Sequence, residues 1–238
     1  TRYLHEAYTV SMQLSDLHPS SLIQAIRLCL SSCVHCGTPT SNPLWLCEPC
    51  LKQVHPFFIA TTILPEYSKI LTTSLLSWEN KNFHPLTSLI YSLKNPSHTE
   101  IWQAWAQQLA VKLVNSSQLL PPLHQTVLIP CPSRQNFRFD HAFALAFNLS
   151  KHLDISVSMA LGERSQAPQK ELRLLERKQI QMKLLDTDVL KFKYFVFVDD
   201  IISSGNTAMA AWKALGSPKK FYVWTLFHRP KLALKSEL

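Results

Sequence analysis

The sequence predicts an α/β protein with a mostly parallel twisted sheet flanked by helices and a small amino-terminal four-cysteine zinc ribbon. Short apolar runs rich in β-branched and aromatic residues alternate with amphipathic segments of helical period along most of the chain. This alternation is typical of parallel sheets with right-handed crossovers. Four of the six cysteines fall in two Cys-x2-Cys pairs. A chain of 238 residues is long enough for one sizeable domain and a small extra unit.

The composition is that of a globular protein, with 46% hydrophobic and 17% charged residues. A formal net charge of +8 indicates polyanionic partners or substrates, although charge alone says nothing about the fold. No uninterrupted apolar stretch approaches the ~18 residues of a membrane span. The first residues also lack the layout of a signal peptide. We therefore expect no membrane insertion and a cytoplasmic protein.

The amino-terminal part divides into two predicted units. Residues 1–28 form a weakly amphipathic helical segment, and residues 29–56 form the ribbon. The predicted zinc ligands are Cys33, Cys36, Cys47 and Cys50. Four thiolates leave no open coordination position, which makes the metal structural. The alternative is two disulfides or free thiols.

Other residues of the ribbon have simpler roles. Gly37 suits the bend that follows the first cysteine pair. His35 is expected to be a bystander because the cysteines already complete the metal shell. Cys29 and Cys131 have no partner at metal-binding spacing and are expected to be buried thiols.

Residues 57–238 form the predicted α/β domain. The stretch 57–86 has a mixed pattern, and an apolar segment then runs into a polar turn at Lys94 and Asn95. Helices are expected at 99–115, 140–153, 168–183 and 206–215, and strands at 126–130, 155–161, 194–198 and 221–227. The apolar faces are expected to contain Ile101, Trp102, Trp105, Leu109, Val111 and Leu113 on the first helix, and Phe143, Ala144, Phe147 and Leu149 on the second. Gly216 fits the position after a helix C-cap.

The most informative motif follows the strand at 194–198. Asp199 and Asp200 come directly after it, and a hydroxyl-rich turn then leads into a helix. The turn consists of Ser203, Ser204, Gly205, Asn206 and Thr207. Paired carboxylates beside the N–H groups of a helix start can hold a sugar phosphate and its cation. The alternative is a buried strand with a solvated acidic end and a capped helix.

These residues resemble a known family. The stretch 195–208 resembles the phosphoribosyltransferase signature, in which four apolar residues precede two acids and a Thr-Thr-Gly-x-Thr loop. The four-cysteine ribbon, the Leu93-Lys94 turn and the Pro130-Cys131-Pro132 segment resemble the ComF or GntX-like, competence-associated subfamily. The resemblance covers roughly residues 29–230.

The resemblance implies a phosphoribosyltransferase type I-like fold that binds phosphoribosyl pyrophosphate. Asp199 and Asp200 would contact the ribose hydroxyls, directly or through magnesium, and the turn 203–207 would cradle the 5′-phosphate. Lys94 and Asn95 would lie in a pyrophosphate loop after the first core strand, although Lys94 could equally be a solvated lysine in a turn. Asp200 is the best candidate for a general base, or it only orients the ribose.

Several positions depart from the family pattern. Ser203 and Ser204 replace the two threonines and keep the hydroxyl groups. The family's Arg-Gly-Phe-Asn-Gln segment is Phe-Arg-Phe-Asp-His at 137–141, which leaves Arg138 in the glycine position as a candidate substrate ligand. Its later Arg-x-x-Asn begins at Arg177 but has Ile180 in place of the asparagine. We therefore expect phosphate binding more firmly than turnover.

The resemblance implies a role in DNA uptake during natural transformation, with an uptake helicase as a possible partner. An alternative is a non-catalytic module that binds single-stranded DNA. Its binding surface would use Lys191, Lys193, Lys219, Lys220, Arg229 and Lys231. Trp45, Phe57 and Phe58 could stack bases, although aromatic residues beside a metal site more often form its core. A salvage or amidotransfer enzyme lacks an evident base-recognition motif.

Overall fold

The computed structural model describes residues 31–59, 70–78, 84–95, 99–116, 120–133, 140–163 and 181–229. The predicted helical segment 1–28, and most of the predicted helix 168–183, lie outside these residues. The predicted division between a ribbon at 29–56 and a domain at 57–238 stays a prediction.

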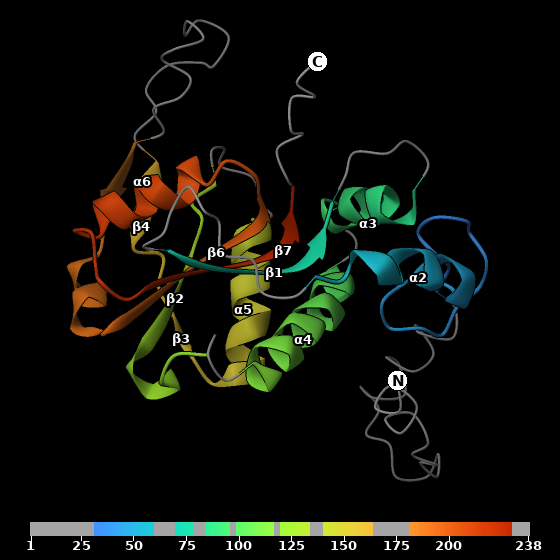
Figure 1. The fold of residues 1–238 in the computed structure, drawn as a ribbon, viewed down its shortest axis with the longest axis horizontal. Helices are drawn as coiled ribbons and strands as arrows, with labels where there is room; N and C mark the ends of the chain where they lie inside the picture. Colours follow the sequence, from blue (N-terminus) through green and yellow to red (C-terminus); the bar gives the residue numbers. More distant parts are fainter. Residues whose placement is uncertain are drawn as a thin grey trace, which may run out of the picture.

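The described part is an α/β structure built on a five-stranded sheet in the order β1-β7-β6-β2-β3 (Figure 1). All four strand pairs are parallel. The strands are β1 (Leu71–Ser77), β2 (Thr126–Pro130), β3 (Ser156–Val157), β6 (Tyr194–Ile202) and β7 (Phe221–His228). A separate antiparallel pair joins β4 (Leu161–Glu163) to β5 (Met182–Leu184). The prediction of a mostly parallel sheet flanked by helices is confirmed.

The helices are α2 (Glu48–Val54), α3 (Pro85–Leu93), α4 (Thr99–Asn115), α5 (His141–Leu153) and α6 (Asn206–Ala214). Short 3-10 turns lie at His55–Phe57, Leu123–Gln125 and Thr187–Lys191. The predictions at 99–115, 140–153 and 206–215 are confirmed to within about one residue. Gly216 has φ +80°, as expected of the residue that follows a helix C-cap.

Three predictions of secondary structure were wrong. We expected the first core strand directly before Lys94, but this segment is helix α3. The first strand of the sheet is instead β1, which lies in the stretch 57–86 whose pattern we described as mixed. The predicted strand 155–161 is the short β3, with β4 beginning at Leu161, and the end of the predicted helix 168–183 is part of β5.

Two apolar layers cover the two faces of the sheet. One contains buried side chains of α3, α4 and α5 together with Leu44, Leu46 and Val54 of the ribbon. The other contains Ala208 and Ala211 of α6 together with residues of β4, β6 and β7. The ribbon therefore shares one core with the α3–α5 side of the sheet.

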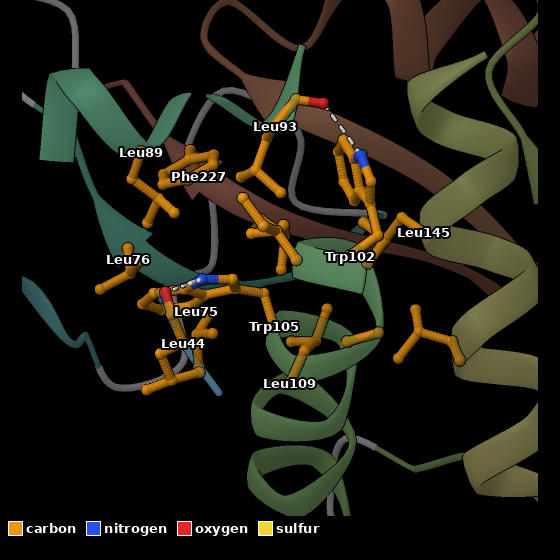
Figure 2. Close-up of a cluster of buried hydrophobic side chains, with 14 of the residues drawn as sticks. Leu44, Leu75, Leu76, Leu89, Leu93, Trp102, Trp105, Leu109, Leu145 and Phe227 are labelled. Carbon is orange, nitrogen blue, oxygen red and sulfur yellow. Dashed lines mark hydrogen bonds between the residues drawn. The ribbon is translucent and has the colours of Figure 1, made fainter. Parts of the chain in front are cut away.

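Two tryptophans of α4 join these parts (Figure 2). Trp102 and Trp105 are almost fully buried. The indole N–H of Trp105 donates to the carbonyl oxygen of Leu44 in the ribbon at 3.3 Å. The indole N–H of Trp102 donates to the carbonyl oxygen of Leu93, the last residue of α3, at 2.9 Å. Helix α4 thus contacts the ribbon and α3 from inside the core.

The segment that follows the ribbon reaches the edge of the sheet. Ile59 donates its N–H to the carbonyl oxygen of Leu75 in β1 at 3.2 Å. The ammonium of Lys112 on α4 donates to the carbonyl oxygens of Ile59 and Ser74. Burial lowers the pKa of Lys112 to about 8. The side chain of Lys112 therefore connects α4 to β1 and to the segment that follows the ribbon.

We expect Trp105→Ala to lower the free energy of unfolding by about 3–5 kcal/mol, because it removes a large buried ring and leaves a cavity. Urea unfolding measures this value. Val111→Ala on the same helix is the control, since Val111 is 50% exposed and should change stability by no more than ~0.5 kcal/mol. Equal losses in the two variants would contradict the assigned core.

Candidate functional site

The candidate site lies between two neighbouring strands, β2 and β6, whose following connections run toward opposite edges of the sheet. From β2 the chain passes through α5 to β3 on one side, and from β6 it passes through α6 to β7 on the other. The strands β2 and β6 are neighbours, with Pro130 beside Val198. Their carboxyl ends therefore form a topological switch point, where open α/β sheets bind ligands.

The acid pair lies at this switch point, inside the last part of β6. The strand continues through Asp199 and Asp200 to Ile202, past the end that we predicted at residue 198. Side chains of a strand alternate between faces. Asp199 therefore lies on the α6 face with Phe197, and Asp200 lies on the α3–α5 face with Val198.

Backbone hydrogen bonds hold both carboxylates. The N–H of Asp200 donates to Asp199 Oδ1, and the N–H of Ile201 donates to Asp200 Oδ1, each at 2.9 Å. Burial raises the pKa of Asp199 well above its usual range, and the charge of Asp200 raises it further. Burial and the charges of Asp199 and Asp200 also raise the pKa of Cys131, which follows β2 and is partly buried. A cation would relieve this concentration of negative charge.

Of the predicted turn 203–207, Ser203, Ser204 and the N-cap Gly205 precede α6, whereas Asn206 and Thr207 are the first two residues of that helix. Gly205 is buried and has φ +73°, a conformation that side chains other than glycine rarely adopt. The first N–H groups of a helix have no acceptor within that helix. The side chains of Asp199, Ser203, Ser204 and Thr207 line a small pocket of about 40 Å³ beside Gly205. The pocket has room for a water molecule or for part of an anion.

Lys94 reaches the acid pair from a helix. It is the C-cap of α3, and its Nζ lies 4.0 Å from Asp200 Oδ2. Asn95 lies in the exposed turn after α3, where its N–H donates to the carbonyl oxygen of Ser92. The structure thus places Lys94 beside Asp200. We predicted that Lys94 follows a strand, but it follows helix α3.

Other predicted residues fall where the structure makes no statement. Arg138 and its neighbours at 134–139 lie outside the described residues, as do Arg177 and Ile180.

The sequence analysis missed His141 as a site residue. It is the first residue of α5, and its ring stacks on Trp102 with centroids 6.0 Å apart and planes at 19°. Burial lowers its pKa; the charge of Lys94 also lowers it, and those of Asp200 and Asp140 raise it. The available signal was a histidine at the start of a helix that follows a strand end.

Two aromatic residues of α5 lie on the surface, contrary to the predicted inward face. Phe143 is 38% and Phe147 is 44% exposed, and their rings stack with centroids 5.9 Å apart. The buried face of α5 consists of Ala142, Leu145, Ala146, Leu149 and Leu153. Phe143 and Phe147 line an open pocket of about 410 Å³ between the starts of α4 and α5. Val111, also predicted inward, is half exposed.

The four cysteines of the ribbon form one cluster. The sulfur atoms of Cys33, Cys36, Cys47 and Cys50 all lie within 4.8 Å of one another, and no disulfide joins them. Sulfurs of a tetrahedral zinc site are about 3.8 Å apart, as Zn–S bonds of ~2.3 Å require. The cluster can therefore hold a structural zinc ion. Gly37 has φ +74°, as the bend after the first pair requires.

The protonation of these thiols is uneven. Hydrogen bonds with the side chain and backbone of Thr38 lower the pKa of the exposed Cys36 to about 6. Burial raises the pKa of Cys50. His35 Nδ1 lies 3.0 Å from Ser88 Oγ of α3. His35, which lies between the cysteines of the first pair, therefore links the ribbon to α3.

The described residues proposed for DNA contact fall at two ends of the strands. Lys191, Lys193, Lys219 and Lys220 precede the amino ends of the parallel strands β6 and β7, whereas Arg229 follows the carboxyl end of β7. Arg229 lies over the ring of Trp78 at 5.1 Å. Lys231 lies outside the described residues. Trp45, Phe57 and Phe58 pack against the core, which favours a structural role for them.

No protein-family model matches this chain, and a search of curated proteins finds no match. In the described part of the chain, no helix is both long and apolar enough to cross a membrane.

We expect the wild-type chain to contain about one zinc ion and Cys50→Ser to lose it, because a buried ligand is removed. Elemental analysis measures the zinc, and thermal melting should show a fall of several degrees, since the ribbon shares its core with α4. Cys131→Ser is the control and should retain the metal. Zinc retained at wild-type level in Cys50→Ser would contradict the assignment.

We expect Asp199→Asn to stabilise the ligand-free protein. The raised pKa means that the folded chain keeps this proton to a higher pH than the unfolded chain. The free energy of unfolding therefore falls as the pH rises from ~4 through the folded pKa. Asparagine removes this fall, so the melting temperature at neutral pH should rise by roughly 2–4 °C, as for a gain of about 1 kcal/mol.

Melting curves from pH 4 to pH 8 check this expectation. The control is Asp154→Asn, because Asp154 is exposed at the end of α5 with φ +54°, a conformation that asparagine tolerates. A lower melting temperature for Asp199→Asn than for Asp154→Asn at pH 7.5 would contradict the expectation.

Proposed function

We propose that this protein binds phosphoribosyl pyrophosphate with magnesium on a phosphoribosyltransferase type I-like domain of the ComF or GntX-like family. The observation that carries the proposal is the grouping at the switch point of the acid pair, the Gly205 turn and Lys94. These groups come from β6, the start of α6 and the end of α3. They are the groups that a sugar, its 5′-phosphate and a pyrophosphate would need.

Each group has a part that follows from its chemistry. Asp199 and Asp200 supply oxygen ligands for the ribose hydroxyls and for Mg²⁺, which favours oxygen and usually keeps substrate phosphates in its shell. The helix start and the hydroxyls of Ser203, Ser204 and Thr207 suit a phosphate dianion. The ammonium of Lys94 lies 4.0 Å from Asp200 in the ligand-free protein. When ligand binds, it would pair with the pyrophosphate in place of that carboxylate, as a compact positive charge.

The wider role follows from the resemblance alone. We propose a cytoplasmic protein that acts in DNA uptake during natural transformation, with the zinc ribbon as the unit that would contact single-stranded DNA or an uptake helicase. Transfer of the phosphoribosyl group to a nitrogen acceptor is the proposed reaction. The alternative of a purely DNA-binding module loses support from the separation of the basic residues and from the packing of Phe57 and Phe58.

We expect millimolar phosphoribosyl pyrophosphate with Mg²⁺ to raise the melting temperature by ~5 °C or more, as ligand at about 100 times its Kd adds roughly 2.7 kcal/mol. Asp200→Asn should abolish the shift, because it removes the carboxylate that faces both cation and ribose. Asp154→Asn should keep it.

Absence of a shift in the wild-type protein would contradict the proposal. The DNA-binding alternative makes a different prediction, namely binding that falls steeply with salt and survives Asp200→Asn.

A further inference from the structure

His141 lies at the start of α5, near enough to Asp200 and Lys94 for their charges to act on its ring. It opens α5 directly after the N-cap residue Asp140, at the switch point between β2 and β6. Its ring stacks on Trp102, and the Trp102 indole donates to the carbonyl oxygen of Leu93. Leu93 precedes Lys94, whose ammonium faces Asp200. The imidazole is therefore connected, through the Trp102 ring and the carbonyl group of Leu93, to the end of α3 that lies beside Asp200.

The charges around the imidazole come from several elements. Lys94 acts from α3, Asp200 from β6 and Asp140 from the N-cap of α5, while Trp102 of α4 contributes an uncharged ring. Burial is the largest effect and lowers the pKa of His141. The imidazole is therefore neutral at pH 7 and can accept a proton. By contrast, Asp200 already faces Lys94 and would face the cation.

We propose that His141 is the proton acceptor of the reaction at this site. The phosphoribosyl acceptor is then a nucleophile that still carries its proton when it binds, such as an amine, a ring N–H or water. This inference rests on the proposed function. It also assigns a role to a residue that stands where the resembled family has glutamine.

The step is balanced without a further reagent. The nucleophile forms a bond to C1 of the ribose, and the bond between C1 and the pyrophosphate oxygen breaks. The electron pair of that bond leaves with pyrophosphate, whose charge Lys94 would neutralise together with a cation held by Asp199 and Asp200. The proton of the nucleophile moves to the His141 imidazole and later to solvent.

The test uses water as the nucleophile, so that no acceptor has to be known. Formation of ribose 5-phosphate and pyrophosphate is measured with the 238-residue chain, Mg²⁺ and saturating phosphoribosyl pyrophosphate, from pH 5 to pH 8. The wild-type rate should rise with pH through the imidazole's pKa, which lies below the ordinary ~6.5, and then level off. His141→Gln should lower the rate by about 10²–10⁴-fold and remove this rise.

Binding and chemistry are separated in the same samples. His141→Gln should keep the melting shift with phosphoribosyl pyrophosphate and a half-saturating concentration within about threefold of the wild-type value. In His141→Ala, added imidazole should restore part of the ribose 5-phosphate formation, which a merely structural role would not allow. The control is His152→Gln, because His152 is exposed in the last turn of α5.

The outcomes distinguish the two proposals. A wild-type melting shift without product, or a His141→Gln variant with the wild-type rate and pH profile, overturns the role of His141 and leaves the binding function in place. Absence of the melting shift in the wild-type protein overturns both.

Discussion

The hydrogen bond from the Trp102 indole to the carbonyl oxygen of Leu93 fixes the end of α3, and the candidate site depends on that end. Leu93 is the last residue of α3, and such a carbonyl has no partner within its own helix. The next residue is Lys94, whose Nζ lies 4.0 Å from Asp200 Oδ2. The same indole supports the ring of His141 on its face. One buried tryptophan therefore sets two of the groups that surround the acid pair.

The ribbon and the residue that follows it contact α3 elsewhere. Ser88 Oγ of α3 lies 3.0 Å from His35 Nδ1 of the ribbon, and the ring of His84, the N-cap of α3, contacts that of Phe57 with centroids 4.8 Å apart. Trp105 adds the bond from α4 to Leu44. A zinc ion that orders the four cysteines would thus also order α3, although the cluster is distant in sequence from Asp200. A metal held by the four cysteines would therefore stabilise the same core that positions α3 beside the candidate site.

The sequence predicted the elements whose signal is local and missed those whose signal is not. Strand β6 and helix α6 carry their own apolar pattern, acids and turn, so these elements were recognisable from the sequence. Strand β1 contains Thr72, Thr73 and Ser74, which look polar but are buried. Ser74 is satisfied by Thr225, whose hydroxyl oxygen lies 2.6 Å away on β7. A partner 151 residues further along cannot be inferred from the segment itself.

The positions of Lys94 and His141 near the acid pair also depend on contacts between distant segments, which the sequence does not reveal. Lys94 was identified by resemblance, but its position at a helix end was not, because Leu86–Leu93 has the apolar content of either a strand or a helix. His141 was missed because its importance comes from Trp102 and Asp200 on other elements. On α5, small alanines face the sheet and let the helix approach closely, which leaves Phe143 and Phe147 outside. A sequence can thus name candidate residues for a phosphate site, whereas the topology decides which side chains of other elements lie beside them.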